Sequence, residues 1–379
     1  MTREPTYQAA RAVAATVEAH FARHIIEARR RGETELAQAP DARTIEAIID
    51  ASFWASFRPE EGRFPKISLS FLPPDKEGRA LMLAERLPLT PSVLTKLAPA
   101  VERPGIHLGV WRDADDLYVW GATRAIPSLG FVLEDVEPGQ LVIKHRRIDG
   151  FGKFANVAVL KGEQVKVVDE KGASLPDCPD LIESLRAFTA PATWDDSVNV
   201  LVQLAASMRA HGHGGTLLVV PADKDEWRGS IVHPIFYSVA PPFAKLAQLI
   251  GRLPGPDNES EWQASLRSAV ESIAGLTAVD GATVITDRFE VLAFGVKIQR
   301  AGHESVEQMV VTEPIVGNQA VVVPPVQHGG TRHLSAAQFI HDQRQALALV
   351  ASQDGRFTVF AWSPCEDKVH AHRVDVLLL

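Results

Sequence analysis

The segment Gly212-His-Gly-Gly-Thr-Leu-Leu-Val-Val-Pro221 sets the architecture of the second half of the chain. Its apolar run, residues 216–220, lies between a glycine-rich turn and a proline, which predicts a strand buried on both faces. We expect an amphipathic helix just before it, at residues 195–209. The apolar side chains of that helix fall on one face: Val198, Leu201, Val202, Ala205 and Met208. A helix that leads into a doubly buried strand indicates an α/β arrangement.

Further helices and strands alternate after this segment. The patterns predict helices at residues 243–250, 261–273 and 332–343, and β-hairpins from the strand pairs 277–286 with 290–299 and 346–352 with 356–362. The second hairpin turns at Asp354-Gly355, a pair typical of a type I′ turn. This half is therefore predicted to be a mixed sheet flanked by helices.

The first half begins with two predicted helices, one at residues 7–31 and one from Asp41, a good N-cap, to the stop at Pro59. Alternating apolar residues then predict six short strands, at residues 66–71, 105–111, 117–122, 131–134, 140–145 and 155–160. We expect this half to be an α+β, β-rich domain. A short helix at 178–188 and a linker at 189–193 divide the chain into an N-terminal domain, residues 1–190, and a C-terminal domain, residues 191–379.

Composition excludes several classes of protein. The 379 residues carry a net charge of −8, and neither half has the basic excess that nucleic-acid binding needs, so nucleic acid is not an expected partner. The two cysteines, Cys178 and Cys365, form no disulfide framework. The sequence shows neither a signal-peptide core nor an apolar run of about 18 residues, so we expect a soluble, cytoplasmic protein without a membrane segment.

Familiar catalytic motifs are missing too. The P-loop, dinucleotide-binding, zincin, nucleophile-elbow and zinc-ribbon patterns do not occur in the sequence. Two histidine pairs, His211 with His213 and His370 with His372, have no third ligand at metal spacing, so no zinc site is predicted there. The remaining candidates for chemistry are polar residues at the ends of predicted strands and helices.

Asp280-Gly281-Ala282 is the first candidate. A carboxylate inside an otherwise apolar strand is costly unless it meets a cation or hydrogen-bond donors, and a glycine lets a ligand approach the backbone. A β-bulge is the structural alternative and explains the same pattern equally well.

Gly329-Gly330-Thr331-Arg332-His333 opens the predicted late helix. Glycines followed by a threonine N-cap expose backbone N–H groups at the positive end of the helix, and Arg332 and His333 add positive charge, as in a phosphate site. An ordinary N-cap with a surface arginine is the alternative. The third candidate, Ser352-Gln353-Asp354-Gly355, lies at the tip of the last hairpin and by itself is typical of a plain turn.

Taken together and in this order, the three motifs resemble those of the diadenylate cyclase family. That family carries an Asp-Gly-Ala motif on a strand, a Gly-Thr-Arg-His-Arg motif opening a helix, and a Ser-Glu-Glu type motif at a later strand end. The segment 212–221 is also similar to the family's early strand, and the resemblance covers residues 195–370. By its position, the first half resembles the sensor domains that precede such cyclase domains.

The resemblance implies the condensation of two ATP into cyclic di-AMP, a bacterial second messenger, and two pyrophosphates. Two cyclase domains would face one another in a homo-oligomer, each holding one ATP. Asp280 would hold Mg²⁺ or Mn²⁺ and orient the ribose 3′-OH, while the backbone of Gly281 and Ala282 contacts the nucleotide. The resemblance assigns catalytic roles to Asp280, Arg332 and His333, phosphate binding to Arg332, His333, Gly330 and Thr331, and a hydroxyl contact to Ser352.

Two residues depart from the family pattern. Leu334 replaces a second arginine, and Gln353, also expected at the nucleotide, replaces a glutamate, so each change removes a charge from the site. One extra residue between the motifs would shift the helix start and bring Ser335 near the phosphates. The alternatives to an active or weakly active nucleotidyltransferase are a degenerate nucleotide-binding sensor with the same fold and a scaffold protein that uses its β-rich half for protein contacts.

Overall fold

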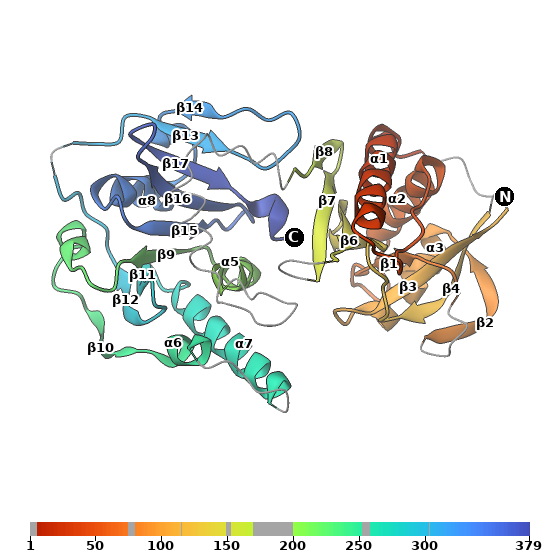
Figure 1. The fold of residues 1–379 in the computed structure, drawn as a ribbon, viewed down its shortest axis with the longest axis horizontal. Helices are drawn as coiled ribbons and strands as arrows, with labels where there is room; N and C mark the ends of the chain where they lie inside the picture. Colours follow the sequence, from red (N-terminus) through yellow and green to blue (C-terminus); the bar gives the residue numbers. More distant parts are fainter. Residues whose placement is uncertain are drawn as a thin grey trace. The chain divides into compact units, whose positions relative to one another are not determined.

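The computed structural model describes residues 6–74, 80–114, 116–148, 153–169, 200–251, 258–302 and 304–379. These residues form two compact units, one ending at Asp169 and the other at Leu378 (Figure 1). The predicted helix at 178–188, the linker at 189–193 and the domain boundary at residue 190 lie outside the described residues. Each unit contains one mixed sheet with helices, which confirms the predicted fold class.

The first unit is built on an eight-stranded sheet in the order β2-β4-β3-β1-β5-β6-β7-β8. β1 pairs in parallel with β3 and antiparallel with β5, and all six predicted strands are present. The strands are β1 (Ser68–Phe71), β2 (Leu81–Pro88), β3 (His107–Asp113), β4 (Asp116–Thr123), β5 (Phe131–Glu137), β6 (Gln140–Arg146), β7 (Phe154–Lys161) and β8 (Gln164–Val167).

Three helices belong to this unit: α1 (Gln8–Arg30), α2 (Ala42–Ser56) and α3 (Pro91–Leu97). The predicted cap of α2 is confirmed, because the Asp41 carboxylate accepts a hydrogen bond of 2.8 Å from the N–H of Thr44. The apolar faces of α1 and α2 form one core with alternate residues of the sheet: Val13, Val17, Phe21, Ile45, Ile48, Ile49, Leu69, Phe71, Leu133 and Ile143.

The second unit has a nine-stranded sheet in the order β10-β12-β11-β9-β15-β16-β17-β13-β14, with β9 parallel to β11 and antiparallel to β15. The strands are β9 (Gly215–Val220), β10 (Tyr237–Phe243), β11 (Ala282–Thr286), β12 (Val291–Val296), β13 (Met309–Thr312), β14 (Val321–Val323), β15 (Leu347–Ala351), β16 (Phe357–Ser363) and β17 (Lys368–Arg373). The helices are α5 (Val200–Ala210), α6 (Lys245–Ile250), α7 (Glu259–Leu276) and α8 (Thr331–Asp342).

β9 is buried on both faces, as its apolar run predicts. Leu217 and Val219 belong to the core that contains α5, α6 and α7, whereas Leu218 and Val220 belong to the core that contains α8. The sheet is therefore the middle layer between two sets of helices. None of the described helices is long and apolar enough to span a bilayer.

The start of β11 and the turn of the last hairpin differ from their predictions. β11 begins only at Ala282, because α7 runs on to Leu276 and a turn is needed to connect the helix to the strand. The last hairpin is present, but Gly355 is the only residue at its tip with a positive φ, of +83°. A type I′ turn requires positive φ at both central residues, so the type I′ prediction is wrong.

Asp135 is a buried carboxylic acid on β5. Neither of its carboxyl oxygens has a hydrogen-bond partner among the described residues. Burial raises the pKa of Asp135 to about 8, and the charge of Glu137 acts in the same direction. The folded protein therefore keeps a proton on Asp135 over a pH range in which the unfolded chain releases it.

Replacement of Asp135 by asparagine tests this proton. Because folding raises the pKa of Asp135 from 3.8 to about 8, the wild type loses stability as the pH rises through that window, on the order of 1.4 kcal/mol per pH unit. We expect Asp135→Asn to remove this loss, so that thermal unfolding midpoints of the variant rise relative to the wild type between about pH 5 and about pH 8. Asp113→Asn, at an exposed position paired with Arg86, is the matched control and should follow the wild type. Parallel curves for the wild type and Asp135→Asn would contradict the assignment.

Candidate functional site

Strand pairing brings the predicted motifs to one edge of the nine-stranded sheet. Ala351, the last residue of β15, is paired with Gly215, the first residue of β9. Ala282, the first residue of β11, is paired with Thr216 of β9. The residues that precede β9 and β11 and those that follow β15 therefore share this edge: Gly214, Asp280, Gly281, Ser352 and Gln353.

Arg332 reaches the same edge from the start of α8. A Cβ atom on Gly214 would lie 3.1 Å from Nη1 of Arg332 and 3.3 Å from Cγ of Gln353. The side-chain amide of Gln353 donates a hydrogen bond of 3.3 Å to the carbonyl oxygen of His213. Gly214 has a φ of +69°, so glycine is favoured at this position and leaves space for the arginine.

Asp280 lies in the turn before β11 and is 90% exposed. Its predicted place inside an apolar strand is wrong, because the chain enters the sheet two residues later. Nζ of Lys297 donates a hydrogen bond of 2.6 Å to Oδ2 of Asp280. This hydrogen bond and the charge of Lys297 lower the pKa of Asp280, and the charge of Arg332 acts in the same direction. The carboxylate is therefore ionised and lies within electrostatic range of Arg332.

Gly281 has no room for a side chain. Its φ is +119°, and a Cβ atom would lie 2.6 Å from the carbonyl carbon of Gly295 and 2.7 Å from the carbonyl oxygen of Val296. Backbone atoms of β12 cannot move aside as a flexible side chain could, so only glycine fits. Ala282 is buried, and the pairing of β11 with β12 shifts register next to it. The structural alternative for this motif, a bulge, is thus present together with an exposed carboxylate.

The start of α8 differs slightly from the prediction. Gly330 rather than Thr331 is the N-cap, and no side chain caps the helix. The N–H groups of Thr331 and Arg332 precede the first intrahelical hydrogen bond, which the N–H of His333 donates to Gly330. Thr331 is exposed, and Ser335, one turn further on, is half-buried. The helix thus begins with backbone donors of the kind that bind anions.

His333 points into the core rather than to the open edge. Its side chain is buried, with Nε2 3.4 Å from Oγ1 of Thr358, and its ring packs at a steep angle against the rings of His328 and Phe360. Burial lowers the pKa of His333, so the ring is neutral at physiological pH. The structure therefore brings together Asp280, Arg332 and Gln353, but not the His333 ring, at the exposed edge.

The carboxylate at this edge is a suitable ligand for a divalent cation that arrives with a nucleotide. Asp280 is an ionised, exposed carboxylate, although Lys297 engages one of its oxygens. Among the described residues, Asp280 belongs to no group of three histidine, cysteine or acidic residues whose ligand atoms lie close together. Mg²⁺ and Mn²⁺ commonly bind through one or two carboxylates plus substrate phosphates, so one carboxylate is compatible with such an ion.

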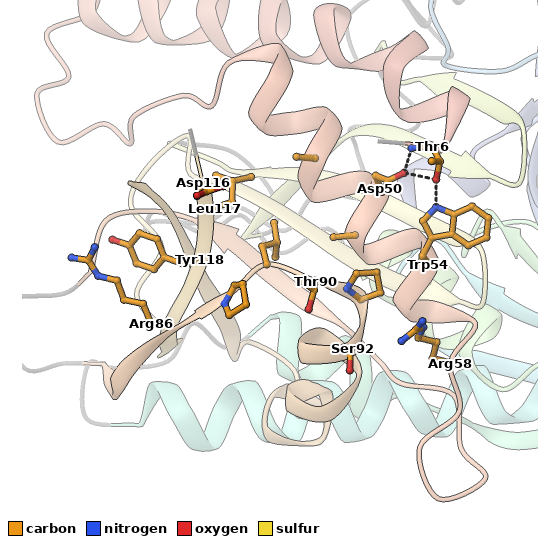
Figure 2. Close-up of a pocket in the computed structure, with 15 residues that line it drawn as sticks. Thr6, Asp50, Trp54, Arg58, Arg86, Thr90, Ser92, Asp116, Leu117 and Tyr118 are labelled. Atoms are coloured by element: carbon orange, nitrogen blue, oxygen red, sulfur yellow. Dashed lines mark hydrogen bonds between the residues drawn. The ribbon is translucent and has the colours of Figure 1, made fainter. Parts of the chain in front are cut away.

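The first unit contains a separate pocket of about 660 Å³. Asp50 accepts a hydrogen bond of 2.7 Å from the N–H of Thr6, and Nε1 of Trp54 donates one of 3.0 Å to the Thr6 hydroxyl (Figure 2). The guanidinium group of Arg86 lies 4.6 Å from the centre of the Tyr118 ring. The remaining lining residues are Ala47, Ala51, Arg58, Pro88, Leu89, Thr90, Pro91, Ser92, Asp116 and Leu117. This mixture of aromatic, apolar and charged groups suits a small organic ligand.

Comparison with known families finds one match within this unit. A family model described as a probable sensor domain, DACNV, matches residues 34–124. The matched segment contains the whole pocket lining except Thr6. The first unit is thus consistent with the predicted N-terminal sensor domain. No diadenylate cyclase catalytic domain is matched, and no curated protein matches the chain.

One group of histidines escapes prediction from the sequence. His20 and His24 on α1 lie close to His145 on β6, with one ring nitrogen of each within 4.8 Å of the others. The spacing of four residues between His20 and His24 is a usable signal, because it places both side chains on one face of a helix. The third member comes from a distant strand, which the spacing cannot reveal.

Substitution of Gly281 by alanine tests the close packing before β11. We expect Gly281→Ala to destabilise the second unit by about 1–3 kcal/mol, because the new Cβ meets backbone atoms and the positive φ is strained. Denaturant unfolding followed by circular dichroism measures the change. Gly275→Ala is the control, since Gly275 lies within α7 and has open space around it; it should be neutral or stabilising. Equal effects of the two substitutions would show that Gly281 is not crowded.

Proposed function

We propose that the chain is a diadenylate cyclase that condenses two ATP into cyclic di-AMP and two pyrophosphates under control of its N-terminal sensor unit. The observation that carries this proposal is the meeting of Asp280, Arg332 and Gln353 at one edge of the sheet. These residues come from three separate motifs whose order resembles that of the family. The sensor-domain match at residues 34–124 agrees with the proposed domain order.

The charges at the edge suit a nucleotidyl transfer. In the proposed reaction the ribose 3′-OH of each ATP attacks the α-phosphate of the other, forms a phosphodiester bond and loses its proton, while pyrophosphate leaves. Such chemistry depends on alignment and on neutralising phosphate charge more than on a protein nucleophile. Arg332 supplies a permanent positive charge, and the N–H groups at the start of α8 supply donors for phosphate oxygens.

Asp280 binds the ribose and the divalent ion in the proposal, whereas Arg332 binds phosphate. Its ionised carboxylate accepts a hydrogen bond from the ribose 3′-OH and holds the divalent ion, which supplies charge neutralisation at the phosphates when bound. Gly281 and Ala282 follow this carboxylate directly in the chain, and in the proposal their backbone contacts the nucleotide. Thr331 and Ser335 lie within one turn of Arg332 on α8, and Ser352 directly precedes Gln353, so these hydroxyl groups complete the proposed nucleotide site.

The exposure of the edge agrees with pairing of two copies. Asp280 is 90% exposed, so in one isolated copy of the chain the reacting groups of the second unit would lie in water. Phosphoryl transfer favours a site from which water is excluded. A second copy that faces the first covers the edge and brings its own ATP. The proposal therefore includes a homo-oligomer, with the reaction in the cytoplasm, where ATP and Mg²⁺ are available.

A degenerate nucleotide-binding sensor is the second candidate. Leu334 and Gln353 are uncharged where the resembling family has an arginine and a glutamate, and Lys297 already engages one oxygen of Asp280. These observations favour binding without efficient turnover. The two candidates differ in one outcome, because both bind ATP but only the cyclase forms a product.

The product assay is the decisive test. Purified full-length protein is incubated with ATP and Mn²⁺, and the nucleotides are identified by mass; we expect cyclic di-AMP. Asp280→Asn should reduce product formation by at least about 100-fold, because it removes the charge that holds the cation. Asp225→Asn, at an exposed position paired with Arg228, is the control and should leave the rate unchanged. Undiminished product from Asp280→Asn would refute the metal role, and ATP binding without product at any metal would favour the sensor.

Arg332→Ala tests the phosphate contact separately from turnover. Loss of a charged hydrogen bond should raise the Kd for a non-hydrolysable ATP analogue by about 10- to 100-fold, measured by titration calorimetry. Arg267→Ala provides the matched control, since Arg267 is exposed on α7, away from the start of α8 in the sequence. An unchanged Kd for Arg332→Ala would remove this residue from the proposed site.

A further inference from the structure

Three imidazole rings meet between α1 and β6 of the first unit. The ring centres of His20 and His24 are 4.0 Å apart, and each lies 5.5 Å from that of His145. One ring nitrogen of each residue lies within 4.8 Å of the others. In the part of the chain that the structure describes, no other three histidine, cysteine or acidic residues bring possible ligand atoms this close.

In two of the three rings, a contact of Nδ1 with a backbone carbonyl oxygen fixes the tautomer. Nδ1 of His24 lies 2.8 Å from the carbonyl oxygen of His20, and Nδ1 of His145 lies 3.1 Å from the carbonyl oxygen of Arg146. A carbonyl oxygen can only accept, so each Nδ1 carries the hydrogen, and in the neutral ring the lone pair is on Nε2. Metal-ligating histidines commonly donate their other N–H to a carbonyl in this way.

His20 supplies the third lone pair. Its Nε2 is buried and has no hydrogen-bond partner among the described residues. The ring thus presents a buried nitrogen whose bonding capacity is unused.

We propose that His20, His24 and His145 bind a divalent transition-metal ion, with Zn²⁺ as the best-suited ion and a fourth coordination position open to water or an external ligand. Imidazole nitrogens suit Zn²⁺ and its neighbours, whereas Mg²⁺ and Ca²⁺ prefer oxygen ligands. Zn–N bonds of about 2.0–2.1 Å in a tetrahedral site put the nitrogens about 3.4 Å apart. The nitrogens lie within 4.8 Å of one another, so ion binding requires the rings to approach further by side-chain rotation.

This site is independent of the proposed cyclase chemistry. It lies in the first unit, uses none of the residues of the 660 Å³ pocket, and requires neither ATP nor Asp280. A bound ion links α1 to β6, two elements that come from distant parts of the sequence. Metal loading therefore also stabilises the first unit against unfolding.

Zinc titration of the full chain tests the proposal. Protein stripped with EDTA and dialysed is titrated with Zn²⁺ against a chromophoric chelator, and bound zinc is counted by mass spectrometry after equilibrium dialysis. We expect one tightly bound Zn²⁺ per chain and a higher unfolding temperature with zinc than without it. His24→Ala and His20→Ala should each raise the Kd at least about 100-fold, the upper end of what loss of an outer-shell partner costs.

Matched variants separate this site from other zinc binding. His213→Ala, which removes an exposed histidine of the second unit, and Asp280→Asn should both retain the wild-type Kd. If His20→Ala does not fold, the zinc Kd of His24→Gln, a substitution at a half-buried position, is compared with that of the wild type instead. Co²⁺ bound by the wild type should show the absorption of a tetrahedral site, which His24→Gln loses. The proposal is overturned if the wild type binds no more zinc than the double variant His20→Ala, His24→Ala, or if zinc protects both equally against heat.

Discussion

Burial of β9 on both of its faces is the constraint on which the second unit depends. Alternate residues of this strand pack against α5 and α7 on one side and against α8 on the other. A shift by one residue would exchange the two sets, so the packing fixes the register with β11 and β15. The turns at the ends of these strands are held at one edge as a result. Core packing, rather than contacts between the polar groups, thus places Asp280, Arg332 and Gln353 near one another.

Most elements could be predicted because their signals are local. The cap at Asp41 and the apolar run of β9 act within a few residues, and both predictions are confirmed. The strands that escaped prediction include β2 and β8, the two edges of the first sheet. β2 has exposed or half-buried side chains along its whole length. Such a strand is stabilised by hydrogen bonds to a neighbour distant in sequence, and its own residues carry no inward-facing pattern.

The candidate site was only partly predictable for a related reason. The three motifs could be found one by one, but their shared edge follows from strand pairing that a single sequence does not specify. The exposure of Asp280 depends on where α7 ends, and helix ends are poorly marked when, as after Leu276, no glycine follows directly. His333 faces inward because of its phase on α8, one residue beyond Arg332. The cluster of His20, His24 and His145 joins a helix to a strand, so no sequence spacing describes it.

The ion pair of Asp280 with Lys297 gives the open edge its own counter-ion. A ligand that brings a divalent cation to Asp280 must displace the ammonium group of Lys297 from the carboxylate, because that carboxylate is already paired. Because Lys297 is part of the chain, the displaced ammonium group remains near the carboxylate, and the local charge changes by the full charge of the ligand. The displaced ammonium group is then available to a phosphate oxygen of the same ligand. The carboxylate is therefore neutralised before an anionic ligand arrives, and loading redistributes positive charge that is already in place.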